Sequence, residues 1–206
     1  MRRLFGASLI VFALLAVKKA AEQGNALAYF NMGQIHRLGL GKAKDHAVAA
    51  NWYRKGAAAG QTDSQYRLGW YLYRGIGVPE DLKESANWVA KAASNGHAKS
   101  QHSLGWMYAK GNGVKKDPKQ AATWFRKSAE QGYPDAQARL GWLHFKGIGT
   151  EPDKAEAYAW FSLAAANKKG GDKVRSSAAK NKSAVAKSMS PAELADAKAR
   201  MKKYRN

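Results

Sequence analysis

The sequence lacks cysteine entirely and holds 15 acidic residues against 35 Lys and Arg. The absence of thiols excludes disulfide bonds, so packing of side chains must stabilise the fold of this 206-residue chain. Lack of cysteine fits a cytoplasmic and an exported protein equally well. It therefore leaves the compartment open.

Catalytic motifs are also missing. The chain contains no HExxH, CxxC, GxSxG or Walker element, and its five histidines, at 36, 46, 97, 102 and 144, form no constellation with other reactive side chains. We therefore expect no enzyme activity, with no catalytic residue, metal, cofactor or small-molecule substrate.

The excess of basic residues gives a formal charge of +20 and a pI of about 10.1. Such a charge attracts acidic proteins, anionic membrane or cell-wall polymer, and nucleic acid. Residues 168–206 hold twelve Lys and Arg against three acids, a net charge of +9. Part of this basic C-terminal tail, 169–206, is expected to be a solvated face.

No apolar run is long enough to span a membrane in the usual way. Leu4 to Val17 are fourteen uncharged residues between two arginines and two lysines, whereas a spanning helix needs about 20. This length favours a signal peptide or anchor. Alternatively, VKKAAEQG at 17–24 aligns with FRKSAEQG at 125–132, which predicts a degenerate capping helix within 1–24. Both interpretations stay open.

What the chain does have is a repeat. LGWMYAKGNGV at 104–114 recurs as LGWYLYRGIGV at 68–78, LGWLHFKGIGT at 140–150 and the weaker MGQIHRLGLGK at 32–42, always 36 residues apart. A fixed period of this size indicates a solenoid, whose units cannot bury their apolar faces alone. Residues 25–168 divide into four units: 25–60, 61–96, 97–132 and 133–168.

Each unit predicts a pair of helices. In 61–96 the first helix runs from about Asp63 to Arg74, GIGV forms the turn, and Asp81 begins the second helix, which ends near Gly96. Glu84 completes a reciprocal capping box with Asp81. The same box is expected for Asp117 with Gln120 and for Asp153 with Glu156.

A glycine inside each first helix costs about 1 kcal/mol relative to alanine. Gly69 lies beside Leu68 and Leu72 on one helix face, so we expect its missing side chain to allow close approach of a partner helix. The same role is expected for Gly33, Gly105 and Gly141. The second helix of each unit contains a tryptophan, and these four tryptophans are also 36 residues apart. We assign them to packing: Trp52, Trp88, Trp124 and Trp160.

Taken together, LGWMYAKGNGVKKDPKQAATWFRKSAEQG resembles the Sel1-like repeat, a helix-pair relative of the tetratricopeptide repeat, over roughly residues 20–168. AYAWFSLAAA at 157–166 and MSPAELADAK at 189–198 resemble the closing segment of bacterial members, with Ser190 as N-cap and Glu193 as reciprocal cap. The resemblance implies an all-α, right-handed superhelical solenoid of antiparallel helix pairs with a C-terminal capping segment.

The resemblance also implies a non-enzymatic adaptor that binds proteins, often in bacterial envelope or secreted complexes. Some branches carry a disulfide in each repeat, which this chain cannot form. We expect a periplasmic, envelope or secreted protein, with a cytoplasmic location as the alternative.

A partner would lie on the side of each first helix that faces away from the packing stripe. At 100° per residue, Tyr66, Trp70, Tyr73 and Arg74 lie opposite Leu68, and by resemblance this side lines a concave groove. Alternatively, the tryptophans wedge against the adjacent unit. The predicted groove residues are Trp70, Trp106, Trp142, Tyr66, His102, Tyr73, Phe145, Arg37, Arg74, Lys110 and Lys146.

Three functions fit this pattern. The first hypothesis is an adaptor whose groove takes an acidic or aromatic segment of a partner, because Trp and Arg are favoured anchors of interfaces. The second is an envelope scaffold held by its basic surface to anionic membrane or cell-wall polymer. The third is a nucleic-acid binder that stacks bases on its aromatic residues. We expect the first.

Overall fold

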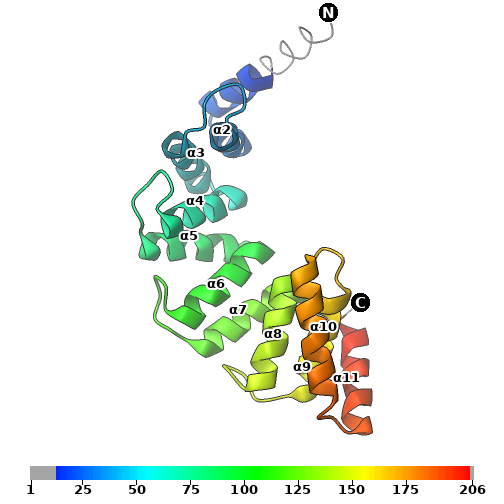
Figure 1. Cartoon of the computed structure of the whole chain (residues 1–206). Coiled ribbons are helices and arrows are strands. Elements are labelled where there is room, and N and C mark those ends of the chain that lie inside the picture. The colour runs from blue at the N-terminus through cyan, green and yellow to red at the C-terminus, as the bar shows by residue number, and fades with distance from the viewer. Residues whose placement is uncertain (1–12, 205–206) are drawn as a thin grey trace, which may run out of the picture. The chain divides into compact units, whose positions relative to one another are not determined.

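The computed structural model describes residues 13–204, and within them every regular element is a helix (Figure 1). Residues 13–22 are helical. The helices that follow are α2 (Ala26–Leu38), α3 (His46–Ala58), α4 (Thr62–Arg74), α5 (Leu82–Ser94), α6 (Ala98–Lys110), α7 (Pro118–Glu130), α8 (Pro134–Lys146), α9 (Lys154–Ala166), α10 (Asp172–Ala186) and α11 (Pro191–Lys203).

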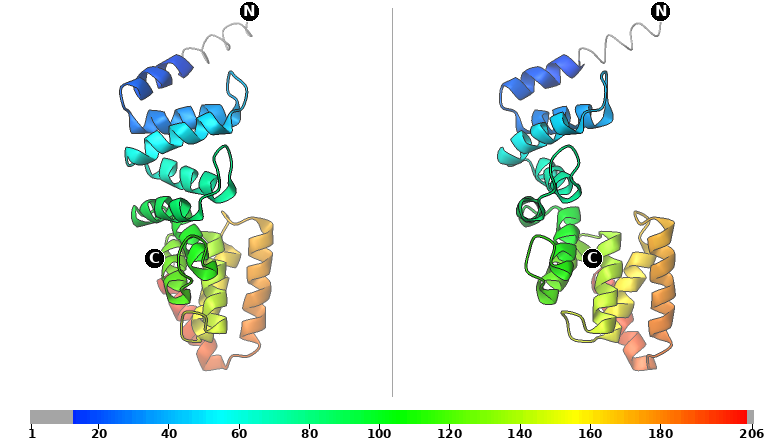
Figure 2. Two further views of the ribbon diagram at one scale, coloured as in Figure 1. Left: turned by 90° about the vertical axis from the view of Figure 1, so that its left-hand side faces the viewer. Right: turned by 60° about the vertical axis from the view of Figure 1, so that its left-hand side comes forward.

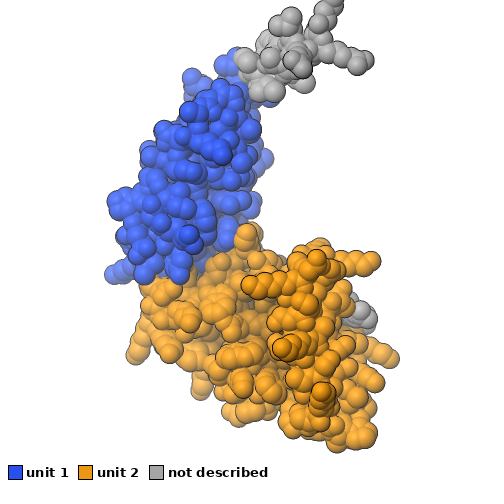
Figure 3. Space-filling model, viewed as in Figure 1, with its two compact units in different colours: residues 1–95 blue, residues 96–206 orange. Residues whose placement is uncertain are grey.

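The helices α2 to α9 pack as consecutive pairs, which confirms the predicted all-α solenoid of helix pairs. Contacts divide the chain into two compact units, residues 1–95 and residues 96–206, coloured separately in Figure 3. Each unit has its own apolar core, so each is described by itself.

The turn inside each pair is closed by backbone hydrogen bonds. Gly75 ends α4 in the left-handed conformation, and the Asp81 amide then donates to the Leu72 carbonyl at 3.0 Å. The Asp81 carboxylate accepts from the Glu84 amide. The prediction of a reciprocal capping box is wrong here, because the Asp81 amide already donates to the Leu72 carbonyl and is not available to the Glu84 side chain. Among the described residues only Ser190 and Glu193 form one.

The glycine within each first helix marks a close approach, as predicted. A Cβ on Gly105 would lie 2.9 Å from the Phe125 ring, and one on Gly69 would lie 2.6 Å from a methyl of Val89. Phe125 and Val89 belong to the second helix of the same pair. The helix therefore accepts glycine because its neighbour occupies the space of a side chain.

Side-chain amides join the helix pairs in a way the sequence patterns do not predict. Gln137 donates to the Ala129 carbonyl of α7 at 3.3 Å, and its oxygen accepts from Asn167 at 3.1 Å. Gln65 makes the corresponding bonds to Ala57 and Asn95. Such buried amides satisfy carbonyls at helix ends that would otherwise lose hydrogen bonds.

Two helices cover different faces of α9, as Figures 1 and 2 show for α10 and α11. Phe161 packs in a cluster with Ala178 and Val185 of α10. Trp160 packs in another cluster that includes Tyr204, the residue after α11, with ring centroids 4.5 Å apart. These helices form the expected C-terminal capping segment.

The helix at 13–22 packs against α2 through a cluster of Ala21, Ala28, Met32 and Ile35. This is the contact that a capping helix would make. No helix within residues 13–204 is long and apolar enough to cross a membrane. The signal-peptide interpretation concerns mainly residues 1–12, which lie outside the described residues, and it stays a prediction.

In each unit one helix pair meets the preceding pair at the second glycine of its turn, Gly77 in the first unit and Gly149 in the second, and this contact can be tested. Gly149 has φ +70°, and a Cβ there would lie 2.0 Å from the Pro118 carbonyl oxygen; Gly132 has φ +77° with nothing within 4 Å. Both Gly→Ala changes incur the left-handed penalty, about 1–2 kcal/mol. Gly149→Ala also creates a backbone clash, so we expect it to destabilise the protein by at least about 2 kcal/mol more than Gly132→Ala.

Urea denaturation of both variants measures this difference. Equal losses of unfolding free energy would mean that the backbone contact between pairs does not constrain the repeat.

Candidate functional site

The predicted groove residues of the first unit, residues 1–95, differ in exposure. Trp70 on α4 is 40% exposed, whereas Tyr66 is only 8% exposed and offers little surface to a partner. Arg74 is exposed and Tyr73 is half-buried. Arg37 of α2 is half-buried and donates to Gln34 at 2.7 Å, so its guanidinium is partly engaged within the unit.

In the second unit, residues 96–206, two predicted tryptophans share a cation. Trp106 of α6 and Trp142 of α8 are half-buried, and the Arg139 guanidinium lies 3.7 Å from the Trp106 ring centroid and 5.2 Å from that of Trp142. We call these three residues the Trp-Arg-Trp stack. Arg139 was not among the residues predicted from the sequence.

Arg139 forms no ion pair with an acidic residue in the described part of the chain. Within residues 13–204 its guanidinium makes no ion pair or hydrogen bond, although Asp135 lies one helical turn earlier on α8. Burial lowers the pKa of this guanidinium below its ordinary value. A half-buried cation without a counter-ion is unfavourable unless a ligand or solvent compensates its charge.

His102 holds the Trp106 side chain in position. The Trp106 indole donates to His102 Nε2 at 3.2 Å, and the imidazole packs against the rings of Phe125 and Tyr133. Burial lowers the pKa of His102 to about 4, with Asp135 opposing the shift. The imidazole is therefore neutral at pH 7, and its Nε2 can accept a hydrogen bond from the indole N–H.

Within the second unit the packing of the tryptophans fits the interpretation that they wedge against the adjacent unit, and the groove interpretation stays a prediction. Trp106 and Trp142 pack against a cluster that contains Phe125 and Leu143, as wedged side chains would. Each also contributes a ring face to Arg139.

The remaining predicted groove residues of this unit are exposed. Phe145 is 39% exposed, with the Lys146 ammonium 5.1 Å from its ring centroid. The Lys110 ammonium lies 5.9 Å from the Trp106 ring centroid.

The second tryptophan series is only partly core. Trp160 is 1% exposed, which confirms packing for that residue. Trp52, Trp88 and Trp124 are half-buried, and each carries a lysine ammonium 4.2 to 4.6 Å from its ring centroid. These lysines stand three residues after the tryptophan, one turn along the helix.

The geometry of repeated helix pairs agrees with a comparison against protein families. The Sel1 repeat model matches residues 26–61, 62–97, 98–133 and 134–169, well over half of the chain. The chain belongs to the Sel1 repeat family. Its proteins generally mediate protein–protein interaction and are generally non-catalytic scaffolds.

Solved structures of this family resemble the chain. A Sel1 repeat protein from Oxalobacter formigenes is 33% identical with a TM-score of 0.73, covering 84% of this chain and 67% of that one. A protective antigen of uropathogenic Escherichia coli with an SLR fold is 31% identical with a TM-score of 0.58, covering 93% of this chain and 48% of that one. The chain thus spans about half of the antigen. No curated protein matches it.

The neutral state of His102 predicts a pH dependence of stability. The unfolded histidine takes up a proton near pH 6.5, whereas the folded one does so only at about pH 4. Protonation between these values therefore favours the unfolded state, and stability falls as the pH falls through this window. Between pH 7 and pH 4 the loss of unfolding free energy due to His102 is expected to reach about 3 kcal/mol.

Unfolding free energies of the wild type and His102→Gln at pH 7, 6, 5 and 4 measure this effect. The wild type should lose more stability than the variant over this range. Parallel curves would contradict a buried, neutral His102.

Proposed function

We propose that the protein is a non-enzymatic adaptor and that the Trp-Arg-Trp stack binds an acidic segment of a partner protein. The observation that supports this most directly is the Arg139 guanidinium, which lies between two indoles and has no carboxylate partner within residues 13–204. Family membership supports a protein partner.

The chemistry of the stack favours a carboxylate. Indole faces stabilise the guanidinium by cation–π attraction and hold its plane, which leaves the N–H groups at its edge to donate to a ligand. A guanidinium grips a carboxylate with two parallel hydrogen bonds, and partial burial strengthens such charge-assisted bonds. The exposed Lys110 and Lys146 add positive potential on the same two helices.

Aromatic side chains of the partner could add to this binding. Trp106 and Trp142 are half-buried rather than enclosed, and Phe145 is exposed. Tryptophan and arginine are the residue types that most often carry the binding energy of interfaces. An acidic segment with a neighbouring aromatic residue therefore matches the site better than an acidic segment alone.

The remaining predicted groove residues, on α2 and α4, belong to the same proposal as further contacts of the partner, with Trp70 and Arg74 the most exposed. The envelope-scaffold hypothesis rests on the overall charge of +20, and the nucleic-acid hypothesis rests on that charge together with the aromatic residues. A periplasmic, envelope or secreted location also stays a prediction.

Removing the Arg139 charge should strongly reduce capture of the partner. Immobilised wild-type protein is incubated at physiological salt with bacterial envelope and cytoplasmic extracts, beside Arg139→Gln and the matched control Lys119→Gln, an exposed lysine on α7. Since a hydrogen-bonded charge contributes about 1.5–3 kcal/mol, Arg139→Gln should retain at least about tenfold less of a specific protein.

Lys119→Gln should retain the same amount as the wild type, and circular dichroism should show that both variants fold. Equal capture by all three proteins, or capture of nucleic acid or lipid only, would contradict the proposed site.

A further inference from the structure

The way α11 binds α9 identifies a recognition surface. Arg200 donates to Asp153 at 2.7 Å and to Glu156 at 3.2 Å, and the Tyr204 hydroxyl donates to Glu156 at 2.7 Å. The Trp160 indole donates to the other oxygen of Glu156 at 2.8 Å, and its ring stacks on Tyr204. One carboxylate thus gathers three donors.

The buried and half-buried apolar residues of α11, together with Tyr204, form one helical stripe, and Met201 and Tyr204 of this stripe pack on the α9 cluster that contains Trp160. Leu194, Ala197, Met201 and Tyr204 are spaced by three or four residues, and all are buried or half-buried. Arg200 lies beside this stripe, four residues before Tyr204. An amphipathic helix of this kind is a common ligand of helical grooves.

The same surface recurs 72 residues earlier. Arg54, Asp81, Glu84 and Trp88 stand where Arg126, Asp153, Glu156 and Trp160 stand in the later repeats. Part of the geometry recurs as well, because the Trp88 indole donates to Glu84 at 3.0 Å as the Trp160 indole does to Glu156. Arg54 of α3 pairs with the Glu84 carboxylate, whereas Arg126 bonds His144 Nε2 and the guanidinium on Glu156 is that of Arg200. We call these four residues the α3/α5 face.

The intervening repeat does not have this set. Asp117 and Trp124 are present there, but Gln120 replaces the glutamate and Ala90 replaces the arginine. A neutral amide cannot hold a guanidinium as a carboxylate does. The resemblance between the α3/α5 face and the surface under α11 is therefore more than the repeat itself requires.

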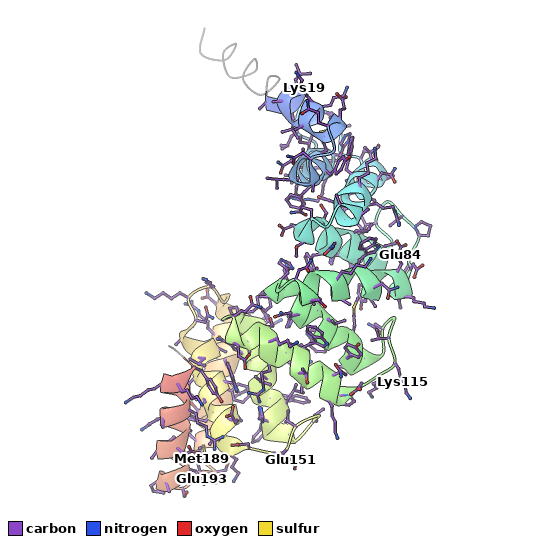
Figure 4. All side chains as sticks on the ribbon, turned by 180° about the vertical axis from the view of Figure 1, so that it is seen from behind. Lys19, Glu84, Lys115, Glu151, Met189 and Glu193 are labelled. Atoms are coloured by element: carbon purple, nitrogen blue, oxygen red, sulfur yellow. The ribbon has the colours of Figure 1, made fainter. Side chains whose placement is uncertain are left out.

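No helix of residues 13–95 lies over Trp88 as α11 lies over Trp160. The Lys91 ammonium, 4.2 Å from the ring centroid, is there instead, and α9 has Leu163 at the position of Lys91. The Glu84 side chain is 32% exposed, whereas that of Glu156 is 12% exposed. Figure 4 labels Glu84 at the second helix of its pair.

We propose that the α3/α5 face binds an amphipathic helix of a partner protein in which an arginine precedes a tyrosine by four residues, as in α11. The tyrosine would stack on Trp88 in place of the flexible Lys91 side chain, and the arginine would bridge Asp81 and Glu84. This face shares no residue with the Trp-Arg-Trp stack, so the inference does not depend on that proposed function.

Charge supports this occupant. The Asp81 carboxylate accepts the Glu84 backbone amide and makes no ion pair within residues 13–204. Arg54 alone pairs with Glu84. Under α11 the equivalent two carboxylates receive Arg200, which also pairs with Asp196 of its own helix, and Arg126 lies close to the Tyr204 hydroxyl. A second arginine on the α3/α5 face would neutralise the Asp81 charge that Arg54 leaves unpaired.

A peptide with the sequence of residues 190–204, SPAELADAKARMKKY, is the probe. It is labelled at its amino terminus and titrated with the full chain by fluorescence anisotropy. We expect saturable 1:1 binding, at least tenfold weaker for Glu84→Gln and at least threefold tighter for Lys91→Leu. The gain for Lys91→Leu cannot arise from misfolding. A peptide with alanine in place of its tyrosine should bind at least tenfold more weakly.

Two matched variants identify the site. Glu80→Gln removes the same charge beside the face and should bind like the wild type, and Glu156→Gln should also retain binding. No binding to the wild type, or equal affinity for Glu84→Gln, would overturn the proposal. Loss of peptide binding in Glu156→Gln alone would mean that the peptide displaces α11 from α9, and this result would also overturn the proposal.

Sedimentation of the wild type tests a second copy of the chain as the occupant. We expect no self-association that depends on Tyr204. A dimer that is lost in both Tyr204→Ala and Glu84→Gln would assign the face to α11 of another copy and overturn a separate partner.

Discussion

The close contact of two helices at a helical glycine is the constraint on which each repeat depends. Because Phe125 occupies the space beside Gly105, α6 and α7 pack closely, and the residue that follows the glycine must point elsewhere. Trp106 consequently meets Phe125 edge to face, with ring centroids 5.9 Å apart, and turns a face toward Arg139. The packing glycine thus orients the tryptophan next to it, a residue of the proposed binding site.

A stack of helix pairs must also end, and its last pair exposes surfaces that a further repeat would have covered. Here α10 and α11 cover two faces of α9, and its buried residues include both Trp160 and Phe161. The buried Glu156 is satisfied only because Trp160, Arg200 and Tyr204 all donate to it. These polar contacts join α11 to the surface of α9 beside its apolar packing.

Much of the fold could be predicted from the sequence, because the repeat period shows where the helices recur, and glycines and N-cap residues determine the local backbone at helix ends. The pairs of helices, the left-handed glycines and the packing role of Gly69 and Gly105 follow from spacing alone. The capping box of Asp81 and Glu84 could not be judged in this way, because the competing acceptor, the Leu72 carbonyl, becomes a neighbour only after the turn closes.

The candidate site was harder to predict for the same reason. The helical angles correctly predicted an exposed Trp70, but they also predicted an exposed Tyr66, which is buried. The position of a residue around its own helix does not show which neighbouring helices cover it. Arg139 was missed because its meaning depends on Trp106, 33 residues earlier in the chain. The one available signal was the recurrence of RLGW at 67–70 and 139–142.

The most direct test of the account is the NMR signal of the Arg139 side-chain Nε–Hε group, assigned by its disappearance in Arg139→Lys. It is recorded while a peptide of glutamate and tryptophan residues is added at constant salt. Binding at the Trp-Arg-Trp stack predicts a saturable downfield shift of this resonance, together with shifts of the Trp106 and Trp142 indole signals. An unchanged Arg139 resonance, with shifts confined to surface lysines, would contradict a carboxylate-binding role for this arginine.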